Sequence, residues 1–123
     1  MSTHNRKYTH IDLEYIYEMA DGENDFAASI LNECLLKMPQ ILDDLTIAIS
    51  EGNYEDINYA AHKLKSTFGY LGVGELTMLM IEIEQACRIK HGLPWIAASL
   101  EKITTVYELA KTELDEELKI LQQ

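Results

Sequence analysis

The sequence has few residues that break helices. Its 123 residues include only two prolines and six glycines. A chain with so few breakers favours long helices, and no stretch shows the polar and apolar alternation of a β-strand. A single domain of this length can bury roughly two-thirds of its unfolded surface. The sequence therefore predicts one all-α domain with a substantial core.

Basic residues and long apolar runs are also scarce. Twenty-one acidic residues against ten basic ones give a formal net charge of -11. This charge repels a phosphate backbone and argues against nucleic-acid binding as the main activity. No stretch approaches the ~18 consecutive apolar residues of a membrane span, and no apolar run follows the first ten residues. We expect a cytoplasmic protein that binds neither nucleic acids nor membranes.

Motifs for catalysis and for metal binding are missing as well. The sequence contains no glycine-rich phosphate loop, no nucleophile elbow and no HExxH motif. Cys34 and Cys87 are far apart, and each lies among apolar residues, so we interpret both as reduced thiols that fill the core. We expect no metal site, no cofactor and no ATP site. If the protein handles phosphate, it must receive it already activated.

The beginning of the chain is predicted to hold a tail and a short helix. Residues 1–8 show no apolar pattern, so we expect a flexible tail there and a single domain over residues 9–123. Thr9 or His10 is expected to open the first helix, which ends before Gly22.

The second helix is predicted to be long. Asn24 or Asp25 can cap its start, and its apolar positions recur at helical spacing as far as Gly52. Pro39 either separates two helices or kinks one. Because the apolar stripe continues across Pro39 with little loss of phase, we favour one kinked helix.

Three more amphipathic segments follow. Asn53 is predicted to cap a third helix that ends near Gly72, a fourth covers residues 75–90, and the last runs from Trp95 to Leu121. Four such segments joined by short turns bury their apolar stripes most simply as an antiparallel up-down-up-down four-helix bundle. The short first helix is expected to cap one end.

One histidine of the third helix lies opposite its apolar face. At about 100° per residue, Ile57, Leu64 and Phe68 fall on one stripe. The residues within about 60° of His62 on the same wheel are polar, aromatic or small: Asn58, Tyr59, Lys65, Ser66 and Gly69. The pattern therefore predicts an exposed, reactive imidazole.

The segment AHKLKSTFGYLG resembles the signature of the histidine-containing phosphotransfer (HPt) domain. In that signature, a phosphorylatable histidine is followed by lysine at the third position, a small residue at the fourth and glycine at the tenth. These positions hold His62, Lys65, Ser66 and Gly72. Ser66 departs from the usual glycine, and its hydroxymethyl group could crowd a partner or bond to a phosphoryl group. Glu84 falls where the family often carries a Glu or Gln near the imidazole.

The resemblance implies a phosphocarrier rather than an enzyme. His62 would accept a phosphoryl group from a receiver-domain aspartate, relaying it between a hybrid histidine kinase and a response regulator. Lys65 would stabilise the added charge, and Glu84 would orient the imidazole. Magnesium is expected only on the partner receiver domain. The docking rim for receivers would comprise the residues flanking the histidine: Asn58, Tyr59, Lys63, Ser66, Gly69, Tyr70 and Gly72. We expect a monomer.

Three other functions fit parts of the sequence. A helical adaptor that binds receiver domains or other signalling partners without phosphotransfer would show the same helical pattern. A helix-turn-helix DNA binder would place residues 75–90 in a groove, but acidic residues outnumber basic ones there. An enzyme that uses His62 as a general base would need oxyanion donors, of which the sequence shows no sign.

Overall fold

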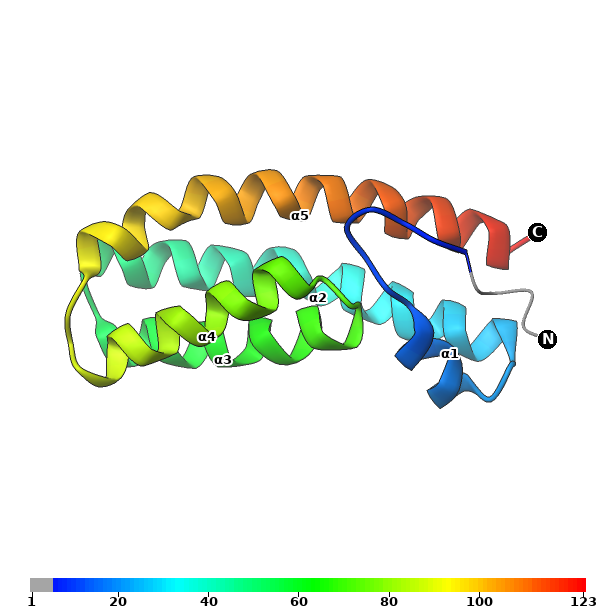
Figure 1. The fold of residues 1–123 in the computed structure, drawn as a ribbon, viewed down its shortest axis with the longest axis horizontal. Helices are drawn as coiled ribbons and strands as arrows, with labels where there is room; N and C mark the ends of the chain where they lie inside the picture. The colour runs from blue at the N-terminus through cyan, green and yellow to red at the C-terminus, as the bar shows by residue number, and fades with distance from the viewer. Residues whose placement is uncertain (1–5) are drawn as a thin grey trace.

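The protein is a bundle of helices in which two long helices run the length of the molecule. The computed structural model describes residues 6–123 and contains α1 (Glu14–Ala20), α2 (Asn24–Glu51), α3 (Tyr54–Tyr70), α4 (Gly74–Arg88) and α5 (Leu93–Leu121). Within these residues there is no strand, which confirms the predicted all-α fold. Figure 1 shows α3 and α4 beside one part of α2 and α5, with α1 beside the other part.

The turns between the bundle helices have the chemistry that the sequence predicted. Gly52 ends α2 with a φ of 65°, and the side chain of Asn53 accepts a hydrogen bond from the Asp56 amide at 3.1 Å. Gly72, with a φ of 66°, turns the chain between α3 and α4. These are left-handed conformations that glycine adopts without steric penalty. They let successive helices reverse direction within a few residues.

The long second helix is continuous. It passes through Pro39 without interruption, which confirms one helix rather than two. The predicted cap at Asn24 or Asp25 is wrong: Glu23 occupies the N-cap position, and no side chain caps the helix. Asn24 instead forms the first helical residue.

The start of the chain differs from the prediction. The first helix begins at Glu14, not at Thr9 or His10. Thr9 and His10 do not start a helix. Their backbone amides instead donate hydrogen bonds to the carboxylate of Glu113 on α5, at 3.1 and 2.8 Å. Residues 6–13, called the strap below, therefore run without helical structure.

The predicted flexible tail, residues 1–8, overlaps the strap. Residues 1–5 of this tail lie outside the described residues, but residues 6–8 belong to the strap. Arg6 and Tyr8 both donate hydrogen bonds to Glu117 on α5. Arg6 and Tyr8 are therefore attached to α5 through a buried carboxylate.

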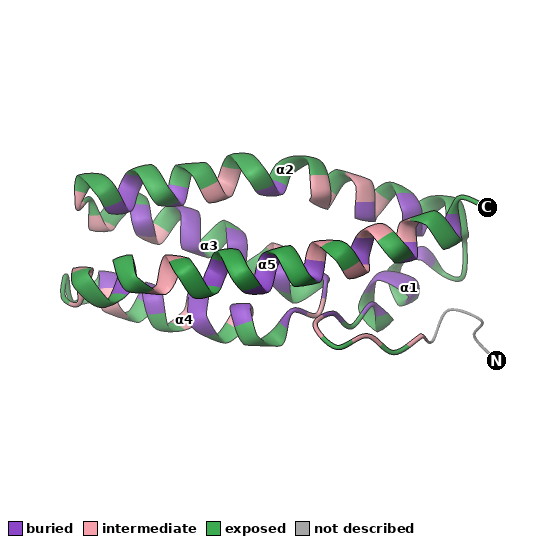
Figure 2. Cartoon of the chain, turned by 90° about the horizontal axis from the view of Figure 1, so that it is seen from above, coloured by how far each residue is buried: buried purple, intermediate pink, exposed green. Residues whose placement is uncertain are grey.

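One hydrophobic core runs through the bundle and extends beneath α1. Figure 2 shows buried positions recurring along the helices of the bundle. Leu64, Phe68 and Ile83 are fully buried, as the apolar stripes predicted. Phe26 and Leu109 are exposed, because they lie about 140° and 120° from Leu31 and Ile103 at the centres of their helices' buried faces. Among residues 6–123, no helix is long and apolar enough to span a bilayer.

Candidate functional site

The imidazole of His62 faces solvent from the middle of α3. Its side chain is 63% exposed. The opposite face of the same helix carries Leu64 and Phe68, both fully buried, so core packing fixes the rotation of the helix. The position of His62 on the outer face agrees with the predicted wheel.

A buried carboxylate on α4 holds this ring from behind. The Glu84 side chain is 9% exposed, and its Oε2 lies 3.0 Å from His62 Nδ1. Its other oxygen, Oε1, lies 2.8 Å from the ammonium of Lys65. Lys65 is one turn after His62, so both side chains leave the same face of α3 and meet the neighbouring helix. One carboxylate thus binds two residues of the HPt-like signature.

The charge of Glu84 determines how the imidazole is bound. Burial raises the pKa of the Glu84 carboxyl, but hydrogen bonds from Lys65 and His62 outweigh burial, and the pKa lies below its ordinary value. The group is therefore a carboxylate near neutral pH and can only accept hydrogen bonds. Nδ1 of His62 must carry a hydrogen, and in the neutral ring this leaves Nε2 as the nitrogen with the lone pair.

The two lysines near the histidine are both engaged. Lys65 was expected to stabilise a phosphoryl group, and in this structure its side chain is 31% exposed and paired with Glu84. The ammonium of Lys63 lies 4.2 Å from the centroid of the Tyr59 ring, a cation–π contact. Lys63 therefore lies against its own helix, towards the start of α3.

The remaining members of the predicted docking rim differ in their accessibility. Tyr59 and Tyr70 are 65% and 44% exposed. The Ser66 hydroxyl donates to the His62 carbonyl at 3.4 Å, and an added Cβ at Gly69 would meet nothing within 4 Å. Asn58 is only half-buried, yet its Oδ1 atom is buried and has no partner within the described residues.

The structure adds a residue to this surface that sequence analysis missed. Tyr15 of α1 stacks on Tyr70, with ring centroids 5.6 Å apart and planes within 5° of parallel. A pocket of about 650 Å³ is lined by Tyr15 together with Gly69 and Met78. Tyr15 lies on a separate helix, so its only sequence signal was an aromatic side chain off the apolar stripe of α1.

Gly72, a predicted member of the docking rim, has no side chain, and the strap passes close to it. An added Cβ at Gly72 would overlap the backbone of Asp12, because the strap crosses the α3–α4 turn at this point. The Asp12 amide donates to the Leu71 carbonyl at 3.1 Å. Gly72 is ten residues beyond His62, about 15 Å along a helix axis. Because Gly72 has no side chain, the turn can form there and the strap can pass close to it.

Within residues 6–123, no three His, Cys, Asp or Glu side chains are grouped as metal ligands would be. The candidate site consists of an imidazole, a carboxylate and an ammonium on a rigid helical surface. Such a surface can present a nucleophilic nitrogen to another molecule.

Comparisons with known proteins agree with this arrangement. The chain matches the protein-family model described as Hpt domain over residues 29–123. Among solved structures, it resembles the HPt domain of an Hpt sensor hybrid histidine kinase from Shewanella, with a TM-score of 0.68 and 22% identity. This likeness covers 87% of this chain and 95% of that one. No curated protein matches the chain. Because the family match spans most of its length, the chain belongs to the Hpt domain family, the histidine phosphocarrier modules of two-component signalling.

Proposed function

We propose that the protein relays phosphoryl groups between receiver-domain aspartates through His62. The donor would be the receiver domain of a hybrid histidine kinase, and the final acceptor that of a response regulator. One observation carries the proposal: an exposed imidazole has Nδ1 bound to a buried carboxylate, which leaves Nε2 as its nucleophilic nitrogen. A histidine buried for structural reasons would not present its ring to solvent.

The transfer itself needs little from this chain. The Nε2 lone pair attacks the phosphorus of the aspartyl phosphate, and the new N–P bond forms as the P–O bond to the aspartate breaks. The bonding electrons leave with the aspartate carboxylate. The ring gains positive charge while its proton stays on Nδ1, and Glu84 offsets that charge at 3.0 Å. The magnesium ion that assists this step is expected on the receiver domain.

Lys65 would balance the charge of the phosphorylated form. Phosphorylation adds up to about two negative charges beside the single charge of Glu84. An ammonium has three donors, so Lys65 can bond to a phosphoryl oxygen while it keeps Glu84 as a partner. Its hydrogen bond to Glu84 also holds it near the ring before the phosphoryl group arrives.

The docking rim would bring the receiver into line with His62. Tyr59 and Tyr70 offer large amphipathic contact surfaces, and Tyr15 extends this surface onto α1. Gly69 has open space above it, so a partner's loop can approach α3 closely. The receiver would thus enclose the imidazole from outside and supply the rest of the active site.

Transfer of label from a receiver domain tests the proposal. The chain is incubated with a receiver domain that carries a ³²P-labelled aspartyl phosphate. We expect the chain to gain a phosphate that is labile in acid and stable in base, as phosphohistidine is. His62→Gln should abolish the label, whereas His91→Gln, which changes an exposed histidine outside the site, should keep it. Label on His62→Gln would refute the proposal, and binding without any label would favour the adaptor function.

A further inference from the structure

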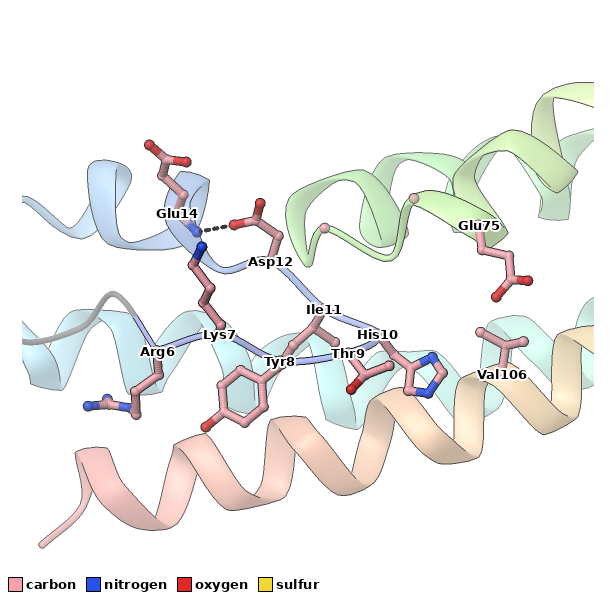
Figure 3. A pocket seen from close by; sticks show the side chains of 12 residues that line it. Arg6, Lys7, Tyr8, Thr9, His10, Ile11, Asp12, Glu14, Glu75 and Val106 are labelled. Atoms are coloured by element: carbon pink, nitrogen blue, oxygen red, sulfur yellow. Dashed lines mark hydrogen bonds between the residues drawn. The ribbon is translucent and has the colours of Figure 1, made fainter.

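The strap is attached to the bundle at three places. Arg6 and Tyr8 bind Glu117, the amides of Thr9 and His10 bind Glu113, and the Asp12 amide binds the α3–α4 turn. Figure 3 shows the strap passing beside α5, with the Lys7 side chain directed away from α5 towards α1. A pocket of about 580 Å³ lies along residues 6–12. The strap is therefore held by these polar contacts together with two apolar side chains, Ile11 and Leu13, that are buried in the core.

The strongest of these contacts is centred on Glu117. This carboxylate is only 1% exposed, although it lies on an otherwise apolar face of α5. Arg6 binds both of its oxygens, at 2.6 and 2.5 Å, and the hydroxyls of Tyr8 and Tyr17 also donate to it. All three donor residues belong to the strap or to α1. A buried carboxylate depends on such donors, because an unpaired buried charge is strongly unfavourable.

The first helix depends on the same contacts. It has seven residues, and isolated helices shorter than about 12 residues are marginal in water. Ile16, Tyr17 and Ala20 are buried against the bundle, and Tyr17 belongs to the Glu117 cluster. The strap and α1 also lie outside the family match, which begins at residue 29. The matched part of the chain contains most of α2 and all of α3–α5.

We propose that the strap and α1 form a latch that closes and opens as one unit on the α2–α5 bundle, with Glu117 as the residue that holds it closed. When the latch opens, Glu117 loses all three donor residues together and gains water. A partly open state would keep a buried carboxylate short of donors, so the two end states are favoured over intermediates. Opening leaves the bundle itself folded.

The latch is coupled to receiver docking, an inference that rests on the proposed function. Tyr15 is carried by α1 and stacks on Tyr70, which is eight residues beyond His62 on α3. Opening removes Tyr15 from the edge of the docking rim and leaves His62, Lys65 and Glu84 in place. Receiver binding should weaken while the chemical step at saturation stays the same.

Hydrogen exchange of the whole chain, followed by mass spectrometry, tests the latch. In Glu117→Gln, we expect amides of α1 and the strap to exchange about 10- to 100-fold faster, because charge-assisted hydrogen bonds are lost. Tyr8→Phe removes one donor only, and a smaller acceleration of the same amides is expected. Exchange in α3 and α4 should not change in either variant. Glu116→Gln removes the same charge from an exposed neighbour and should match the wild type.

Two exchange results would overturn the latch. Equal acceleration in α1 and in α3 would show that the whole domain opens together, and unchanged exchange in α1 would show that Glu117 does not hold it. The milder Tyr8→Phe keeps the test decisive if Glu117→Gln does not fold.

Phosphotransfer kinetics test the coupling separately. In Tyr8→Phe and Glu117→Gln, the receiver concentration that gives half-maximal transfer should rise several-fold, with the rate at saturation unchanged. Faster exchange without this rise would refute the coupling. A wild-type chain that never becomes labelled would refute the proposed function instead, and the exchange results would still decide the latch.

Discussion

Glu84 shows how one buried residue can determine the chemistry of an exposed one. Its carboxylate accepts hydrogen bonds from His62 Nδ1 and from Lys65, and its lowered pKa keeps it charged at neutral pH. The hydrogen on Nδ1 leaves the other nitrogen free to act as the proposed nucleophile, and the same carboxylate holds the Lys65 ammonium nearby. The tautomer of His62 and the position of Lys65 are therefore set by one side chain.

Replacing Glu84 should slow phosphorylation of His62 without removing it. In Glu84→Ala, the ring loses its acceptor and Lys65 loses its partner, so we expect initial label transfer to fall about 10- to 100-fold. In Glu84→Gln, the amide oxygen can still accept from Nδ1, and the loss should be smaller. Glu82→Gln, an exposed change on the same helix, is the control. Equal rates for all four proteins would show that Glu84 does not orient the ring.

Tyr107 offers a contrasting prediction about buried polar groups. Its side chain is 5% exposed, its hydroxyl has no partner within the described residues, and burial raises its pKa. Tyr107→Phe removes an unsatisfied group, so the free energy of unfolding should stay the same or rise by up to about 1 kcal/mol. Tyr17→Phe removes a donor to Glu117 and should lower the free energy of unfolding by about 1–3 kcal/mol. Urea unfolding of both variants measures the difference, and a large loss in Tyr107→Phe would contradict the assignment.

At the scale of the element, α3 carries its buried side chains and the exposed His62 on opposite faces. Leu64 and Phe68 are fully buried, so either change to alanine should lower the free energy of unfolding by about 2–5 kcal/mol. His62→Ala removes an exposed ring and should lower it by less than about 1 kcal/mol. Urea midpoints of the three variants provide the test. Equal losses would place His62 in the core.

The α3–α4 turn joins the strap to the bundle, and Gly72 makes this contact possible. Gly72→Ala places a methyl group against the Asp12 backbone at a φ of 66°. Gly22 has a φ of 79° with nothing within 4 Å of an added Cβ, so Gly22→Ala measures the cost of the backbone conformation alone, about 1–2 kcal/mol. Gly72→Ala should lower the free energy of unfolding by roughly 1–3 kcal/mol more than Gly22→Ala does. Thermal or urea unfolding of the two variants measures this difference. Equal losses would show that the strap moves aside freely.

For the whole molecule, the sequence predicts the bundle well and the strap poorly. The spacing of apolar residues predicts the four long helices. The same spacing in α3 predicts that His62 faces outward. The strap has no periodic pattern, because its backbone bonds to α5 side chains more than one hundred residues away. Such contacts leave only weak signals in one sequence. The sequence does contain one such signal. Glu117 lies on the apolar stripe of α5 between Leu114 and Leu121, where a carboxylate requires a partner.

The buried carboxylates also predict how the stability of the whole domain depends on pH. Burial raises the pKa of Glu117, but hydrogen bonds from Arg6, Tyr17 and Tyr8 outweigh it and hold the pKa below 4.5. The pKa of Glu84 is lowered in the same way. A lowered folded-state pKa means that the unfolded chain binds the proton first as pH falls. Both carboxylates therefore stabilise the fold fully above pH 4.5, and this contribution is lost as pH falls through their folded-state pKa values.

Tyr8 makes the free energy of unfolding depend on pH in the opposite direction, at high pH. Burial, together with hydrogen bonding to Glu117, raises its pKa to about 12, so its contribution is present below the ordinary value of 10.0 and is lost as pH rises towards 12. The free energy of unfolding should thus be nearly constant between about pH 4.5 and pH 9 and fall on both sides, because burial also raises the pKa values of the Cys34 and Cys87 thiols above 9.0. In Glu117→Gln the plateau should be lower, and both the acid and the alkaline losses smaller, because one group links both titrations. Urea unfolding across the pH range measures this. A Glu117→Gln curve parallel to that of the wild type would mean that the pH dependence arises elsewhere in the molecule.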